Sequence, residues 1–208
     1  LGLDIHDLEG FFRHVLERVD WTRDLHFQTR TTMDTLDYSG TGLNAGSKVV
    51  IAAAGPAQRV LSTTLPPDLN LPVGYRNPRF ALPGVLTISA PPFTDAQSGE
   101  AQAAAFAAAM GSADRWPGVA LIVLCDDSEF AAQKRNNFLW VTFTRSNPSH
   151  DIYGVESFTD HKHWGCRGPL IIDARIKPHH APPLVEDPTV SRRVDQLAAP
   201  GGPLHGIL

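Results

Sequence analysis

A continuous apolar run, "GVALIVLC" from Gly118 to Cys125, constrains the fold more than any other feature of the sequence. It has no polar residue with which one face could meet water, so we expect a strand covered on both faces, as in a parallel sheet. Asp126 and Asp127 follow at its carboxyl end, where open α/β sheets place ligands. The simpler interpretation, which we favour, is that Asp127 or Ser128 caps the next helix.

Helical and strand patterns alternate along the chain. Apolar residues three and four positions apart predict amphipathic helices, alanine-rich sequence predicts another, and β-branched runs predict strands. Helices are expected over 7–19, 99–112, 129–144 and from Asp187 onward, and strands over 24–30, 48–54, 84–90, 151–155 and 169–174. The second half of the third helix should be buried, and residues 56–83 should hold little regular structure. These patterns predict a layered α/β fold, with a mostly parallel sheet flanked by helices.

Length and composition exclude several classes of protein. The 208 residues fit one domain, or a domain with an extension. The net charge is -4 and no basic stripe is visible, so we expect no nucleic-acid partner. The chain has no run of about 18 apolar residues, so we expect no membrane span. The two cysteines favour a reducing cytoplasm over a disulfide framework. The chain does not begin with Met, which suggests a fragment or a processed chain.

A glycine-rich stretch from Gly40 to Gly55, "GTGLNAGSKVVIAAAG", has the composition of a phosphate-binding loop. Such a loop needs its lysine before the hydroxyl residue and a helix directly after it. Here Ser47 precedes Lys48, and the β-branched residues that follow favour a strand. A dinucleotide-binding loop would also follow a strand and not precede one. We therefore expect no nucleotide site here.

Two stretches of the chain are alike. In each, an Arg is followed six residues later by an Asp, and then by a strand, a loop and a second apolar strand. The pairs are Arg18 with Asp24 and Arg145 with Asp151. The pattern fits either a duplicated half-unit or the ordinary regularity of α/β folds.

The second of these stretches, with the apolar run before it, carries a recognisable pattern. A strand ends in paired aspartates, and a helix with an apolar-apolar-Trp pattern runs into Thr-Arg. A Pro and an Asp precede the next strand, and a Gly-containing loop leads to an apolar strand ending Asp-Ala. The pattern resembles the C-terminal domain of UbiD-family decarboxylases, most strongly over 118–181, less over 82–117 and only loosely before that. The matching residues are Asp126, Asp127, Trp140, Thr144, Arg145, Pro148, Asp151, Asp173 and Ala174.

This resemblance implies part of a carboxy-lyase that removes or adds carboxylate on aromatic or α,β-unsaturated acids. The family uses prenylated FMN with a divalent metal and potassium. It holds this cofactor, with a catalytic Glu-Arg-Glu set, in a split-barrel domain for which this chain has no room. The chain would then hold no catalytic or cofactor-binding residue and be inactive alone. It would close over a split-barrel domain or subunit, line part of the substrate pocket and help to build a homo- or hetero-oligomer.

Histidines are concentrated near the C-terminus, and three residues of "HKHWGC" are candidates for a site. His161, His163 and Cys166 could reach one metal, with zinc favoured by the ligand types, although no established zinc pattern supports them. The alternatives are an ordinary polar loop, or a substrate-facing loop in which Trp164 supplies an aromatic wall and His163 a polar contact. We take the loop 156–168 as the pocket-facing element, with His161, His163 and Trp164 as substrate-pocket candidates and no metal site assigned.

The sequence divides into three parts. Residues 1–83 form an N-terminal helix and strand half-unit with a proline-rich connection, 84–185 the UbiD-like α/β core, and 186–208 a C-terminal helix with an apolar tail. The preferred hypothesis is a C-terminal domain or small subunit of a UbiD-like (de)carboxylase. The alternatives are a non-catalytic assembly or regulatory module that kept the fold, and a stand-alone metal-binding protein.

Overall fold

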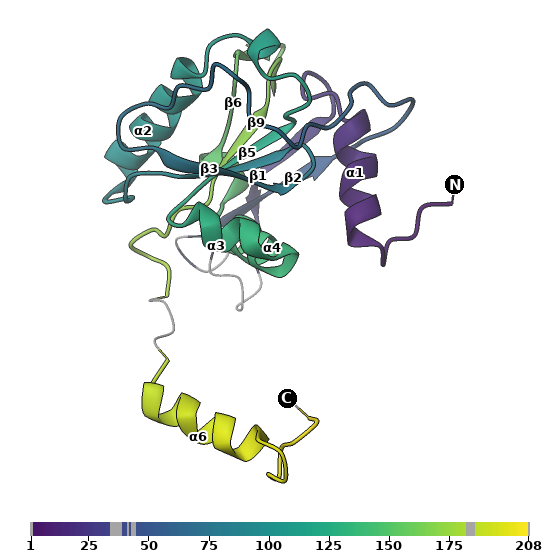
Figure 1. Ribbon diagram of the computed structural model, residues 1–208. Helices are drawn as coiled ribbons and strands as arrows, with labels where there is room; N and C mark the ends of the chain where they lie inside the picture. The colour runs from purple at the N-terminus through teal and green to yellow at the C-terminus, as the bar shows by residue number, and fades with distance from the viewer. Residues whose placement is uncertain (1, 34–38, 41, 43–44, 182–185, 208) are drawn as a thin grey trace.

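The computed structural model describes residues 2–33, 39–40, 42, 45–181 and 186–207. Five strands form its central sheet, in the order β3 (Arg76–Leu82), β4 (Val85–Ser89), β5 (Leu121–Cys125), β9 (Leu170–Asp173) and β6 (Ile152–Gly154) (Figure 1). The three inner strands run parallel, and all their residues are buried. The prediction that the Gly118–Cys125 run contains a strand covered on both faces is therefore confirmed.

The α/β class is confirmed, but the expected mostly parallel sheet is wrong. Of the six strand pairings in the described part of the chain, four are antiparallel. Parallel neighbours need a long crossover, whereas β3 turns into β4 through Pro83 and Gly84 alone. Gly84 has a φ of +76°, which a residue with a side chain rarely adopts.

The expectation that residues 56–83 hold little regular structure is confirmed for 56–75, but it is wrong for strand β3. Pro78 lies inside it, and a proline is tolerated in a strand only at the edge of a sheet, where no neighbour needs its missing N–H group. The register with β4 shifts on both sides of the Arg79–Phe80 pairings, and Asn77 has a positive φ of 53°. This irregularity weakens the alternating pattern by which a strand is recognised.

Helices cover both faces of the sheet. Helix α2 (Ala96–Ala109) packs through Phe106 on the face that carries Leu86, Ile122 and Ile171. Helices α1 (Leu8–Arg18) and α4 (Arg135–Thr144) pack on the opposite face, where Phe138 of α4 is completely buried. A short 3-10 helix (Ala113–Arg115) and helix α5 (Pro148–Asp151) lie in the connections. Among the residues that the structure describes, no helix is long and apolar enough to cross a membrane.

The predicted helix over 129–144 is two helices. Helix α3 (Ser128–Gln133) ends at Gln133, because the backbone of Lys134 is extended. Helix α4 begins directly after Lys134. The expectation that the second half is buried all round is also wrong, since the side chains of Trp140 and Phe143 are 63% and 49% exposed. Phe138, Val141 and Thr142 form the buried side of α4.

Two small antiparallel sheets flank the central one. Strands β1 (Leu25–Thr31) and β2 (Gly46–Ile51) pair in the N-terminal part, so the glycine-rich stretch does contain a strand, as expected. Residues 41, 43 and 44 of that stretch lie outside the described residues. Strands β7 (Ser157–Asp160) and β8 (His163–Cys166) form a tight hairpin within the predicted loop 156–168.

Helix α6 (Pro188–Ala198) lies apart from the layered body (Figure 1), and none of its residues is buried. The helix begins at Asp187, as predicted, because this residue caps it by accepting from the Thr189 backbone N–H at 2.7 Å, and Pro188 occupies the first turn. Its apolar residues Val190, Val194 and Leu197 are exposed. The three-part division at 83/84 and 185/186 stays a prediction.

Candidate functional site

The carboxyl end of the parallel strands is occupied by the chain itself. Asp126 accepts from the backbone N–H of Ile176 at 2.9 Å and forms an ion pair of 3.4 Å with Arg145. Asp127 accepts from the backbone N–H of Phe130 at 3.0 Å and so caps α3, as expected. Both carboxylates therefore have structural partners at the sheet edge where open α/β proteins place ligands.

Buried charges hold the segment after β9 against this edge. The Arg175 guanidinium is fully buried and donates to both carboxylate oxygens of Asp173, at 2.9 and 2.6 Å. Lys177 lies 3.3 Å from the Asp151 carboxylate and donates to the carbonyls of Arg145 and Asp173. Burial raises the pKa of Asp151, because a charged carboxylate loses its hydration there. Each charge in this network has a buried partner, so we assign it to structure and not to ligand binding.

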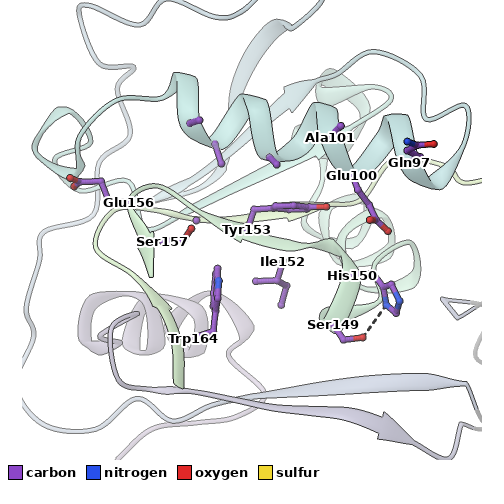
Figure 2. A pocket seen from close by; sticks show the side chains of 14 residues that line it. Gln97, Glu100, Ala101, Ser149, His150, Ile152, Tyr153, Glu156, Ser157 and Trp164 are labelled. Atoms are coloured by element: carbon purple, nitrogen blue, oxygen red, sulfur yellow. Dashed lines mark hydrogen bonds between the residues drawn. The ribbon is translucent and has the colours of Figure 1, made fainter. Parts of the chain in front are cut away.

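Two hollows lie on either side of the β7–β8 hairpin, and Trp164 lines both. The first, the α2 groove, has a volume of about 770 Å³ and runs between α2 and β6 (Figure 2). Tyr153 lies beneath α2 in this view, while Ile152 and Trp164 lie farther from that helix. The second, the β1 pocket, has a volume of about 550 Å³ and lies between β1 and the hairpin.

The hairpin is fixed in place by the N-terminal part of the chain. The backbone N–H of Cys166 donates to the carbonyl of Trp21 at 3.2 Å, and the His163 Nε2 lies 3.1 Å from the carbonyl of Thr22. The Trp164 ring meets Phe27 of β1 edge to face, with ring centroids 5.6 Å apart. Trp164 is thus a positioned wall between the two hollows.

The structure brings together only part of the predicted site. His163 and Trp164 line the β1 pocket, and His161 lines its rim with a side chain that is 95% exposed and bonded to Asp160. Cys166 is fully buried, and burial raises its pKa to about 12, which disfavours the thiolate that zinc requires. No group of three or more His, Cys, Asp or Glu side chains among the described residues could hold a metal. The His161, His163 and Cys166 set therefore does not form a metal site.

Sequence reasoning missed several residues of these hollows. His26 lines the β1 pocket from β1, and Lys162 does so from the hairpin turn. Tyr153 and Glu100 line the α2 groove. Burial, followed by the nearby carboxylates of Asp173 and Asp151, raises the pKa of Tyr153, so its hydroxyl stays protonated at neutral pH. Lys162 could have been suspected between two candidate histidines, but nothing local marks His26 or Glu100.

Comparison with known proteins relates this chain to decarboxylases. Residues 2–53 match the family model of the 3-octaprenyl-4-hydroxybenzoate carboxy-lyase C-terminal domain. This match confirms the resemblance to the UbiD C-terminal domain, and it falls in the part of the chain where the sequence pattern was loosest. The matched residues include helix α1, strand β1 and strand β2.

Two curated relatives match most of this chain. An uncharacterized protein of Chlamydia trachomatis is 32% identical over 85% of this chain, and a 4-hydroxybenzoate decarboxylase subunit of Chlamydia pneumoniae is 32% identical over 88%. This chain spans only 28% and 29% of the lengths of those relatives. A solved structure of Sedimentibacter hydroxybenzoicus vanillic acid decarboxylase aligns with 17% identity and a TM-score of 0.32. The alignment covers 55% of this chain and 27% of the decarboxylase chain. That score is too low to carry a structural argument.

The cofactor implied by the resemblance does not fit the described residues. Prenylated FMN carries a phosphate, which its divalent metal would help to bind, and oxygen, nitrogen or sulfur ligands must converge on that metal. No such ligand group exists in the described part of the chain. We therefore assign no cofactor ligand to these residues.

Proposed function

We propose that this chain is the C-terminal domain or small subunit of a UbiD-like (de)carboxylase acting on aromatic or α,β-unsaturated carboxylic acids. The observation that carries the proposal is the match over 88% of the chain to a protein named as a decarboxylase subunit. The family-model match to a carboxy-lyase C-terminal domain supports the same conclusion. A cytoplasmic location and an oligomeric enzyme belong to this proposal.

The role of the chain would be to close the site and not to carry out the chemistry. Prenylated FMN, a divalent metal and potassium would be held by a split-barrel domain or subunit, together with the catalytic Glu-Arg-Glu set. The hairpin with Trp164 would face that domain and supply an apolar wall. Closure of such a wall excludes water and strengthens electrostatic interactions at the reacting centre, and opening releases product.

Co-expression tests this proposal directly. The chain is purified anaerobically, alone and together with a split-barrel partner subunit and a flavin prenyltransferase, and absorption spectra are recorded. We expect a flavin band and decarboxylase activity only in the complex. A flavin band in the chain alone would place the cofactor site here and contradict the proposal. Failure to form any complex would instead favour a non-catalytic module.

A variant of the complex tests the position of the wall. Trp164→Leu should lower kcat/KM for an aromatic acid about tenfold or more. The aromatic wall is lost, while leucine keeps the position apolar. The matched control is Trp140→Leu, whose side chain is exposed on α4, away from both hollows. Equal losses for the two variants would contradict the assigned position.

A further inference from the structure

The β1 pocket has an unusual chemical lining. Its side chains are apolar, hydroxyl-bearing or basic, and no carboxylate of the described residues lines it. Three different segments contribute, because β1 supplies His26 and Phe27, α5 and β6 supply Ser149 and Ile152, and the hairpin supplies Lys162 and His163. The basic groups therefore converge only in the folded chain, beside aromatic and aliphatic walls.

Two histidines lie beside each other in this pocket, with their rings edge to face. The rings of His26 and His163 lie 6.5 Å apart, centroid to centroid. The Nε2 of His163 lies 3.1 Å from the Thr22 carbonyl, which can only accept, so this nitrogen carries the proton and donates. The contact fixes the ring of His163 while His26 stays exposed to an incoming group.

The turn that carries Lys162 is held in an unfavourable backbone conformation. His161 and Lys162 have φ values of 45° and 67°, so two consecutive residues with side chains adopt the left-handed conformation. A two-residue hairpin turn of this kind normally uses Asn and Gly. The exposed Lys162 forms no ion pair with any described residue. The turn thus presents an unpaired ammonium group at the pocket.

Two carboxylates in the segments that flank the pocket have other partners. Asp160 lies 2.9 Å from His161 Nδ1, on the rim of the hairpin. Asp24 is bonded to Arg23 at 2.7 Å and to the backbone N–H of Asp20 at 2.9 Å. The positive charge of Lys162 is therefore not neutralised within the pocket.

We propose that the β1 pocket is a binding site for the oxyanion group of a small organic ligand, in which Lys162 and His26 contact the anion, while the Thr22 carbonyl holds His163 beside them. Phe27, Ile152 and Trp164 contact its apolar body. The shared ligand chemistry is that of a carboxylate or a phosphate monoester on a flat apolar skeleton. The biological source of the ligand rests on the proposed function, whereas the binding itself is a property of this chain.

Binding to the isolated chain tests this site without the enzyme complex. Benzoate, phenyl phosphate and neutral benzamide are titrated into the ¹⁵N-labelled chain at one pH and ionic strength, and amide and histidine resonances are followed. We expect at least one anion to bind at least about fivefold more tightly than benzamide, the size of one accessible charged contact. The shifts should centre on His26, Lys162 and His163. Tighter binding of benzoate would identify a carboxylate ligand, and tighter binding of phenyl phosphate a phosphate ligand.

Matched variants separate the site from nonspecific attraction. Lys162→Gln should weaken anion binding about fivefold, while Lys134→Gln, which removes an exposed lysine at the α3–α4 junction, should leave it unchanged. His26→Gln, which replaces the exposed histidine of the pocket, should also weaken binding, with an unchanged amide spectrum elsewhere. Equal affinity for benzamide and both anions, or equal losses in the two lysine variants, would overturn the proposal. These outcomes leave the flavin band and activity of the co-expressed complex untouched, so the two proposals fail separately.

Discussion

Asp24 and Asp151 make the same contact in two distant parts of the chain. Each carboxylate accepts from the backbone N–H four residues earlier, that of Asp20 at 2.9 Å and that of Asn147 at 2.6 Å. In both places a helix precedes this turn, and the strand that follows it pairs antiparallel with a later strand, β1 with β2 and β6 with β9. The repeat seen in the sequence is therefore a repeat of local structure.

The two repeated units also bind one another. The Ser47 hydroxyl of the first unit accepts from the Ser149 backbone N–H of the second at 2.8 Å. In the same direction, the Cys166 backbone N–H of the second unit donates to the Trp21 carbonyl of the first at 3.2 Å. Ser47, at the start of β2, thus has a structural role as the link between the two units.

Replacement of Asp151 should be strongly destabilising. Asp151→Asn leaves the ammonium of Lys177, which is 5% exposed, without its buried carboxylate partner. We expect the free energy of unfolding in urea to fall by about 3 kcal/mol, as for other broken buried ion pairs. The control is Glu129→Gln, which removes an exposed pair with Arg79 and should cost less than about 1 kcal/mol. Similar losses in the two variants would contradict a buried charge network.

Asp24 should make stability depend on acid pH. The hydrogen bond from Arg23 holds the pKa of Asp24 below its ordinary value of 3.8 in the folded chain. Its contribution is therefore complete above the unfolded pKa and is lost as the pH falls through the lower folded pKa. Between about pH 5 and pH 2, the stability of the wild type should fall more steeply than that of Asp24→Asn. Parallel curves for the two proteins would show that Asp24 has no lowered pKa.

Gly165 should be intolerant of a side chain. A Cβ atom at this position would lie 2.7 Å from the Trp21 carbonyl oxygen and 3.1 Å from the Thr22 Cα, both of them backbone atoms. Gly165→Ala should therefore push the hairpin off its support and lower the free energy of unfolding by about 1–3 kcal/mol. Gly2→Ala is the control, since nothing lies within 4 Å of that Cβ. An unchanged midpoint for Gly165→Ala in urea would mean that the hairpin is not held there.

Helix α4 should show two very different faces to mutation. Phe138 is completely buried and contacts the ring of Phe12, so Phe138→Ala should cost about 3–5 kcal/mol. Trp140, two residues further along, is 63% exposed, so Trp140→Gln should change stability by less than about 0.5 kcal/mol. The comparison is made by urea unfolding followed by circular dichroism. A large loss for Trp140→Gln would indicate that α4 is buried all round, as its apolar sequence suggested.

Part of the candidate site could be predicted from local sequence, and part could not. Trp164 and His163 were recognisable, because an aromatic residue and histidines in one glycine-containing loop are unusual enough to single out. His26 could not be recognised, since it is an isolated histidine in a strand, and only the pairing of the hairpin with the N-terminal turn brings its ring near His163. Cys166 was misleading, because burial and not spacing decides whether a thiol can bind a metal.

The sequence by itself determined the elements whose signals are local. These are the buried strand that ends at Cys125, the helix starts at Asp127 and Asp187, and the periodic helices. Only the tertiary structure decided the directions of the edge strands, the exposure of Trp140 and the assembly of the β1 pocket. The physical reason is that caps and periodicity act within a few residues, whereas strand pairing and burial depend on partners far away in the chain.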